Sequence, residues 1–368
     1  MKKTLFLTGF PGFLTSNLLK QLYDDHADEI DHIYLLVLLS EEKLAYNTLR
    51  RFAKEGKIPF HKCTVLAGDI TQVNIGLDPD IQEKLATKVT HVFHLAAIYD
   101  LAVPKQIAER VNIHGTAMVN DWVQTLSSIE RYIYFSTAYV SGKREGRIYE
   151  HELDVKQTFR NHYEHTKFIA ELLVEELKTK VPTTIIRPGI VKGHSETGET
   201  IKFDGLYFML NMYDTLSFSP LIPYLEEDGR SPEGNFVPND YVLKATSYVA
   251  MDDIGVGKTY HLTDPNPYTM IELQKMLAQA YLGRAPKGVI PVTLIKNVLA
   301  FAPIRKWLQV EAEAMDYFTI HSSYDTSQIT NDLTGTTIEC VDLAETVGPM
   351  IEFYRKYKDD NIKHIAIK

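Results

Sequence analysis

The sequence predicts an α/β fold in which a doubly wound parallel sheet lies between layers of helices, with a smaller mixed lobe in the C-terminal half. Two observations predict it. In the first half of the chain, short runs rich in β-branched and aromatic residues alternate with longer stretches that have the apolar spacing of amphipathic helices. Such alternation is typical of βαβ units, which build parallel sheets. After Pro188 the alternation ends, and loops with several glycines and prolines take its place.

Strands are predicted at residues 4–7, 33–38, 64–67, 90–95, 131–135 and 183–186. Helices are predicted between them at residues 13–24, 41–55, 104–126 and 161–180, and later at 240–251, 269–283 and 343–357. We therefore expect a first domain over residues 1–188 and a smaller lobe over 189–368. A segment near 235–263 is expected to return to the first domain, because residues 260–262 have the composition of a further strand.

The composition excludes several classes of protein. A formal net charge of -9, with basic residues scattered along the chain, argues against a nucleic-acid partner. The two cysteines, Cys63 and Cys340, lie far apart and lack the spacing of zinc ligands, so we expect no metal site and a cytoplasmic location. The apolar stretch 289–303 could touch a membrane, but Pro291 and Pro303 bound a stretch that is too short to span a bilayer, so no transmembrane segment is expected.

A turn with two glycines follows the first predicted strand, and a helix follows the turn at once. Gly9 permits the tight turn, Gly12 lets the backbone approach a pyrophosphate, and the helix N-terminus offers free amides to that anion. A ligand-free connection between strand and helix is the alternative, but the place of the turn after the first strand favours a dinucleotide site of the Rossmann type. The expected cofactor-binding residues here are Gly9, Phe10, Pro11, Gly12, Phe13 and Leu14.

Two further strand ends contribute candidates for the same site. Asp69, followed by Ile70, closes the third strand, where its carboxylate could accept a hydrogen bond from the adenine amino group or simply cap a turn. The fourth strand ends in Leu95, Ala96 and Ala97, and these small residues would let a cofactor lie close to the backbone. Without a ligand, this second segment is only the end of a buried strand.

The fifth strand ends in Ser136-Thr137, and the next helix begins near Tyr163 and Lys167. Residues four apart project from one face of a helix, so this tyrosine and lysine are expected to lie together. An ammonium near a phenol favours the phenolate and brings its proton affinity closer to the working pH, as acid/base catalysis requires. Thr137 could hold the substrate oxygen. Most such Tyr/Lys pairs only pack and reach solvent, but this one follows a Ser-Thr strand end and a glycine turn in the order that a reductase needs.

The motifs resemble those of the extended short-chain dehydrogenase/reductases. More narrowly, they resemble the branch with fatty acyl-CoA reductases, male-sterility-type proteins and the terminal thioester reductase domains of carboxylic acid reductases. The resemblance covers most of the chain. It rests on Thr8-Gly9-x-x-Gly12-Phe13-Leu14, Ser136-Thr137-Ala138-Tyr139-Val140, Asn161-x-Tyr163-x-x-Thr166-Lys167-x-x-Ala170-Glu171, Arg187-Pro188-Gly189-Ile190-Val191 and Asn235-Phe236-Val237-Pro238-x-Asp240-Tyr241-Val242.

The resemblance implies an NAD(P)-dependent oxidoreductase that reduces a fatty acyl or related thioester, bound to CoA or to an acyl carrier protein, to an aldehyde and possibly further to an alcohol. It gives catalytic roles to Thr137, Tyr163 and Lys167, and the last two are also expected to bind the cofactor. It gives Asn112 the role of supporting the lysine through a helix bend and a water molecule. It also implies that the second lobe binds the substrate. Pro188, Gly189 and Ile190 would border the nicotinamide.

Two departures from the family pattern bear on the cofactor. Thr15 takes the place of the third glycine of the turn, and Leu38 follows strand two where the family often has an arginine for the ribose 2′-phosphate. Arg50 or Arg51, in the following helix, could substitute for that arginine. The resemblance implies NADP as the cofactor, and NAD stays open.

Two other functions use the same first half of the chain. The first is a nucleotide-sugar epimerase or dehydratase, or a hydroxysteroid-type dehydrogenase. The second is a regulator that senses a dinucleotide without turnover, against which the complete set of Thr137, Tyr163 and Lys167 argues. A monomer or a homodimer is expected.

Overall fold

The computed structural model describes residues 2–99, 103–365 and 367, and the chain divides into two compact units. The first unit comprises Met1–Gly142, Leu153–Arg187 and Leu243–Tyr260. The second comprises Lys143–Glu152, Pro188–Val242 and His261–Lys368. The short excursion Lys143–Glu152 into the second unit has no counterpart in the sequence analysis, because its one strand, β6 (Gly146–Ile148), is only three residues long.

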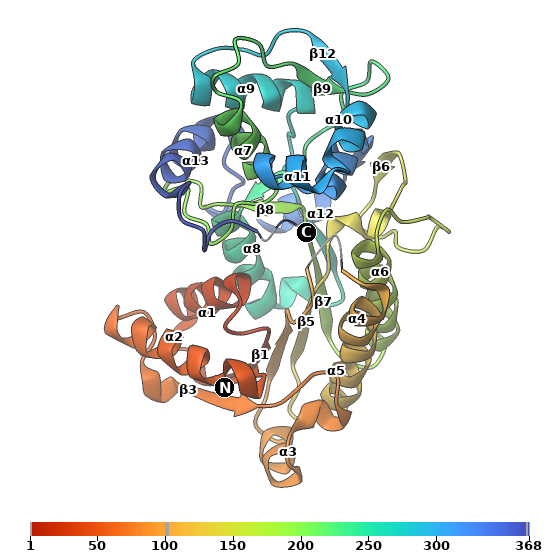
Figure 1. The fold of residues 1–368 in the computed structure, drawn as a ribbon. Helices are drawn as coiled ribbons and strands as arrows, with labels where there is room; N and C mark the ends of the chain where they lie inside the picture. The colour runs from red at the N-terminus through yellow and green to blue at the C-terminus, as the bar shows by residue number, and fades with distance from the viewer. Residues whose placement is uncertain (1, 100–102, 366, 368) are drawn as a thin grey trace. The chain divides into compact units, whose positions relative to one another are not determined.

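A seven-stranded sheet in the order β11-β7-β5-β4-β1-β2-β3 confirms the predicted fold class (Figure 1). From β3 to β7 all neighbouring strands are parallel. The order reverses between β1 and β4, and ligands of such sheets bind at this switch point, beyond the carboxyl ends of the strands. The strands are β1 (Lys3–Thr8), β2 (Ile30–Val37), β3 (Cys63–Ala67), β4 (His91–His94), β5 (Arg131–Phe135), β7 (Thr183–Pro188) and β11 (Thr259–Leu262).

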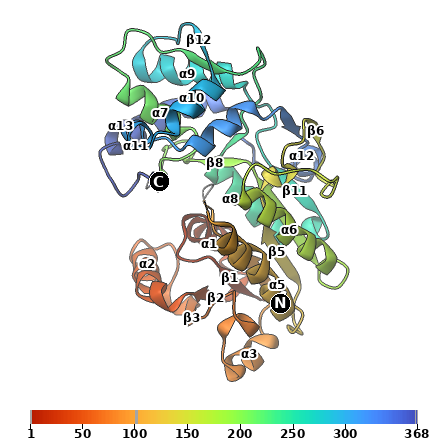
Figure 2. The same cartoon turned by 45° about the vertical axis from the view of Figure 1, so that its right-hand side comes forward.

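Helices cover both faces of the sheet in the first unit. In both views α1 and α2 lie together on one face and α5 and α6 on the other (Figures 1 and 2). The core beneath α5 and α6 is apolar, with the ring of Phe6 on β1 packed 4.4 Å from that of Trp122 on α5. The helices are α1 (Phe13–His26), α2 (Glu42–Lys54), α3 (Pro79–Ala86), α4 (Lys105–Ala108), a π-helical segment (Glu109–His114), α5 (Gly115–Val123), α6 (His162–Leu177) and α8 (Asn239–Met251).

The second unit is helical with three short strand pairs, and it has its own apolar core around Phe203, Tyr207 and Tyr354. Its parallel strand pairs are β8 (Ile190–Lys192) with β10 (Phe236–Pro238), β9 (Tyr224–Glu226) with β12 (Val289–Pro291), and β6 with β13 (Ser322–Tyr324). Its helices are α7 (Tyr207–Thr215), α9 (Met270–Leu282), α10 (Val292–Leu299), α11 (Ala302–Leu308), α12 (Ser327–Asp332) and α13 (Leu343–Tyr357). Within the ranges that the structure describes, no helix has the length and apolar character needed to cross a membrane.

Candidate active site

The glycine turn after β1 has the geometry of a cofactor cradle. Gly9 has a φ of 88°, and a Cβ atom there would lie 2.9 Å from the amide nitrogen of Ala96. The Gly12 amide donates to the Gly9 carbonyl at 2.8 Å, which closes the turn. No side chain caps the first amides of α1, so they are free to bind an anion such as a pyrophosphate. The residues of the turn therefore fit a dinucleotide.

Thr15, which stands in place of the third glycine of the turn, keeps α1 in contact with β1. The Thr15 side chain is buried, and its hydroxyl donates to the carbonyl of Thr8 at 3.5 Å. This hydrogen bond, which a glycine could not make, joins α1 to β1. Phe10 is buried in the turn, Pro11, Phe13 and Leu14 are half-buried, and Gly12 is exposed.

The ends of β1 and β4 are joined by a chain of hydrogen bonds. The hydroxyl of Thr8 lies 2.8 Å from Nδ1 of His94 and accepts the amide of Ala96 at 3.1 Å. Burial lowers the pKa of His94 to about 3, so the imidazole is neutral and acts as a rigid bridge. Leu95 and Ala96 are half-buried and their backbone lies against Gly9 of the turn, whereas Ala97 is exposed.

Asp69 lies at the end of β3, and one of its carboxylate oxygens accepts the amide of Thr71 at 2.8 Å. The carboxylate therefore stabilises its own turn, which was the simpler of the two predicted roles. Ile70 is buried, and a Cβ atom on Gly115 would lie 2.8 Å from its Cδ1, so it packs closely against the start of α5.

Thr137 and Tyr163 lie together at the carboxyl end of β5. The two hydroxyls are hydrogen-bonded, and both side chains are buried. Asn161 caps α6 by accepting the amide of Glu164 at 2.9 Å, which fixes the first turn of the helix that carries Tyr163. The ring of Tyr99 meets that of Tyr163 edge-on at 5.2 Å, a contact that the sequence did not indicate.

The electrostatics of Tyr163 differ from the expectation. Burial raises its pKa well above the ordinary value, and the hydrogen bond with Thr137 offsets only part of this effect. The predicted shift toward the phenolate is absent because burial outweighs the nearby groups. The phenol therefore keeps its proton at neutral pH, which is the form that can protonate an oxyanion.

Lys167 lies one turn after Tyr163 and is buried. Its amino group donates to the hydroxyl of Tyr134 at 2.8 Å and to the carbonyl of Phe135 at 2.6 Å. Burial lowers the pKa of Lys167 to about 7, while the charge of Glu171 opposes this shift. Both partners on β5 hold the lysine at the strand end that precedes Thr137.

We expect Lys167 to make stability depend on pH. The pKa of Lys167 is about 7 in the folded chain and ordinarily 10.5, so the unfolded chain binds more protons between these values. The penalty for the buried charge is complete below pH 7 and is relieved as the pH rises. As the pH rises through this window, the free energy of unfolding of the wild type should increase relative to that of Lys167→Met, by roughly 1.4 kcal/mol per unit of pKa shift. Denaturant unfolding of both chains at several pH values measures this, and a constant difference would contradict the assignment.

Asn112 lies in the π-helical segment, where it is buried. Its side chain accepts the amide of Ile98 at 2.9 Å and donates to the hydroxyl of Thr166 at 3.1 Å. Thr166 precedes Lys167, so Asn112 links the segment after β4 to the helix that carries the lysine. We infer that it positions this helix.

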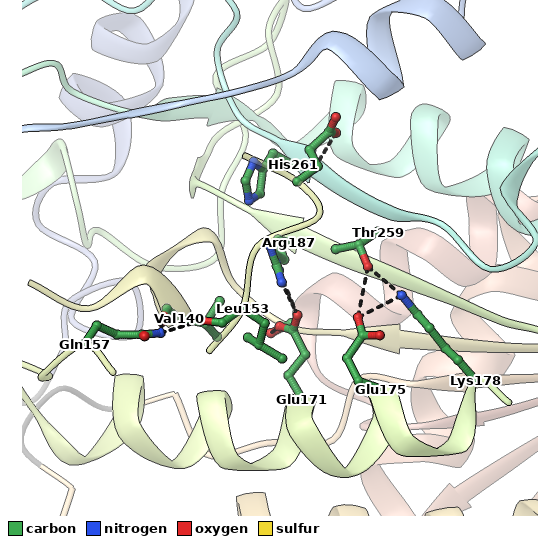
Figure 3. Close-up of polar contacts among 11 residues, drawn as sticks. Val140, Leu153, Gln157, Glu171, Glu175, Lys178, Arg187, Thr259 and His261 are labelled. Carbon is green, nitrogen blue, oxygen red and sulfur yellow. Dashed lines mark hydrogen bonds and ion pairs between the residues drawn. The ribbon is translucent and has the colours of Figure 1, made fainter. Parts of the chain in front are cut away.

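A buried ion pair that the sequence analysis did not assign joins α6 to β7 (Figure 3). Glu171 on α6 accepts from Nε of Arg187 on β7 at 2.8 Å, and its other oxygen accepts from the hydroxyl of Ser136. Both charged side chains are fully buried. Ser136, Glu171 and Arg187 each belong to a different one of the motifs quoted above. This shared membership in motifs was the signal in the sequence that could have identified them. The pair fixes β5, α6 and β7 relative to one another at the ends that bear Thr137 and Tyr163.

The remaining predicted cofactor residues belong to α2 and to the second unit. Arg50 is exposed on α2, where its guanidinium donates to Asn47 at 3.5 Å. Pro188, Gly189 and Ile190 belong to the second unit. There the amide of Gly189 donates to the carbonyl of Leu262 at 3.0 Å, and the amide of Ile190 donates to the carbonyl of Asn235 at 2.9 Å. Among the described residues, no group of three or more His, Cys, Asp or Glu side chains could hold a metal ion.

A family model described as male sterility protein matches residues 7–246, and this range contains the glycine turn and the set Thr137, Tyr163 and Lys167. The chain belongs to this family. The family is a branch of the extended short-chain dehydrogenase/reductases, which are NAD(P)-dependent oxidoreductases, as the motifs predicted.

Curated relatives include a protein named as a fatty acyl-CoA reductase of Drosophila melanogaster, 28% identical over 80% of this chain and 62% of its own. A glycine betaine reductase of Emericella nidulans is 27% identical over 72% of this chain and 21% of its own. The chain thus spans less than two thirds of these relatives.

Solved structures show the same fold. The terminal R domain of the myxalamid PKS-NRPS pathway has a TM-score of 0.80 at 22% identity, covering 98% of this chain and 92% of that domain. The UDP-glucuronic acid 4-epimerase of Bacillus cereus has a TM-score of 0.63 at 16% identity, covering 96% of this chain and 99% of the epimerase.

Proposed function

We propose that this protein reduces a fatty acyl or related thioester to the aldehyde with NADPH. One observation carries the proposal: Thr137, at the carboxyl end of β5, and protonated Tyr163 and Lys167, in the first turns of α6, are all buried. The glycine cradle belongs to the same unit. Family membership supports it, and so do the relatives, which include proteins named as a fatty acyl-CoA reductase and an aldehyde reductase.

The roles of the residues follow from their contacts. When bound, the reduced nicotinamide supplies a hydride to the thioester carbonyl carbon. Thr137 holds the carbonyl oxygen, and Tyr163 donates its proton to the oxygen as negative charge develops there. The resulting hemithioacetal expels the thiol and leaves the aldehyde, and a second reduction would give the alcohol. Lys167 would hold the cofactor ribose and supply positive charge beside the phenol when it is protonated.

The substrate is proposed to arrive on a carrier, either CoA or an acyl carrier protein. Two solved neighbours are reductase domains of peptide synthetases, and one is described as a thiolation-reductase di-domain. An acyl thioester is already activated, so the chain needs no nucleotide-consuming step of its own. We propose that the second unit holds the acyl chain.

Cofactor deuterated at the transferred position tests the chemistry. With an acyl-CoA substrate, the aldehyde trapped from the reaction is expected to carry one deuterium at its carbonyl carbon, and an alcohol product would carry two. Mass spectrometry of the products distinguishes these outcomes. An acyl acid without deuterium would show hydrolysis and would overturn the proposal.

We propose that Arg50 selects NADP by meeting the 2′-phosphate. Its guanidinium is exposed and, among the described residues, has only a long hydrogen bond to Asn47, whereas Arg51 pairs with Glu55 and lies over the ring of Phe52. Arg50→Ala should raise the KM for NADPH about tenfold, as expected for loss of a charge-assisted hydrogen bond, and leave that for NADH unchanged. Arg51→Ala is the matched control. If NADH is preferred by the wild type, the NADP assignment is wrong.

A further inference from the structure

One surface of the second unit combines exposed apolar and basic side chains. It comprises residues 284–310, which contain β12, α10 and α11, and the adjacent loop 217–222, and we call it the α10–α11 surface. The loop exposes Phe218 (77%) and Leu221 (61%). The larger segment exposes Val289 (56%), Leu294 (53%), Val298 (39%), Phe301 (61%) and Trp307 (54%).

The parts of this surface are fixed to one another. Val292 and Leu299 of α10 are buried in the core of the second unit, so Leu294 and Val298, which are four residues apart, lie together outside it. Arg305 on α11 donates to the carbonyl of Leu299 at 2.7 Å, and α10 and α11 lie side by side in both views (Figures 1 and 2).

Arg284 fixes the loop to the same surface. Its guanidinium donates to the carbonyls of Ser217 at 3.3 Å and Pro220 at 3.2 Å, on either side of Phe218. The strand pair β9–β12 adds a second connection, because the amide of Lys287 donates to the carbonyl of Ile222 at 2.8 Å. The exposed aromatic residue of the loop is thereby held beside the start of β12.

The charge of this segment is opposite to that of the chain. Residues 284–310 include no Asp or Glu, although the chain has a net charge of -9. Carboxylates from outside also contact the segment: Asp316 pairs with Lys296, and Glu227 accepts the amide of Thr293 at 2.8 Å at the start of α10. The basic residues of the segment are Arg284, Lys287, Lys296, Arg305 and Lys306.

We propose that the α10–α11 surface binds the face of a membrane that contains anionic lipids. An amphipathic helical surface with Phe and Trp beside Lys and Arg is suited to lie in the plane of the interface, with the aromatic rings at the level of the headgroups and the cations on the phosphates. The described helices are too short or too polar to cross the bilayer, which fits binding at its surface. An acidic protein is the competing occupant, but a bilayer accounts for both the aromatic residues and the excess of cations. The inference does not rest on the proposed reaction.

Trp307 offers a direct readout, because the chain has two tryptophans and the other, Trp122, is buried in the first unit. The full chain is mixed with vesicles of phosphatidylcholine with or without phosphatidylglycerol. We expect co-sedimentation and a blue shift of tryptophan emission with the anionic vesicles, both reversed by salt. Phe301→Ser with Leu294→Ser should abolish binding, and Lys306→Glu should weaken it about tenfold.

Val73→Ser and Ile362→Ser are matched controls, since both residues are exposed and apolar but lie outside this surface. Both should bind as the wild type does, and circular dichroism checks that every variant is folded. The proposal is overturned if the wild type ignores anionic vesicles, or if the surface variants bind as well as the controls. Binding of an acidic carrier protein without vesicle binding would assign the surface to a protein partner instead.

Discussion

Tyr163→Phe is expected to lower kcat by about 10²- to 10⁴-fold, the usual contribution of a positioned general acid. The phenol is buried, hydrogen-bonded to Thr137 and protonated at neutral pH, because burial raises its pKa. Removal of the hydroxyl takes away the proton that the oxyanion needs, whereas the glycine cradle is untouched. Cofactor binding, measured by titration of nicotinamide fluorescence, should therefore remain as in the wild type.

Tyr132→Phe is the matched control for that variant. Tyr132 is a buried tyrosine of β5 whose hydroxyl donates to Asn120 at 3.0 Å, away from the proposed catalytic residues. It should lose some stability but retain turnover within a few fold. If Tyr163→Phe keeps the activity of Tyr132→Phe, the proton comes from another group.

Glu171→Ala is expected to lower the free energy of unfolding by about 3–5 kcal/mol, because it removes the carboxylate with which a fully buried arginine is paired. Arg187 is 1% exposed and Glu171 is not exposed at all. The same change should reduce activity, since the pair and Ser136 hold the strand end that carries Thr137. Urea unfolding followed by circular dichroism measures the effect.

Glu175→Ala, one turn further along α6, is the control (Figure 3). Glu175 pairs with Lys178 at 2.8 Å, but the side chains are 33% and 16% exposed, so water can replace the lost partner. Loss of this pair should cost about 1 kcal/mol or less. Equal losses for the two variants would show that the buried pair has no special structural role.

The sheet could be predicted from the sequence because its strands are short apolar runs separated by long amphipathic helices. The spacing of the apolar residues therefore changes between each strand and the helix that follows it. The glycine turn could also be predicted from the sequence, because Gly9 has a positive φ and no room for a Cβ atom, so the position requires glycine. The short strands of the second unit were not visible, because three-residue strands such as β6 or β13 have no period to detect.

The candidate site was only partly predictable for a related reason. Tyr163 and Lys167 are four residues apart, so their spacing predicted that both lie on one helix, one turn apart. The partners of Lys167 on β5, Tyr134 and Phe135, belong to a continuous apolar strand in which no residue stands out. The pKa of Tyr163 also depends on burial by residues from several elements, so spacing alone predicted the wrong direction.

The central claim is thioester reduction, and one measurement tests it most directly. The purified chain is incubated with NADPH or NADH and a panel of acyl-CoA and acyl carrier protein thioesters, while cofactor oxidation and free thiol are followed together. The account predicts that thiol appears only with reduced cofactor, at one thiol per cofactor for aldehyde or one per two for alcohol. Cofactor binding without thiol release from any thioester would contradict it and favour a sugar or alcohol dehydrogenase.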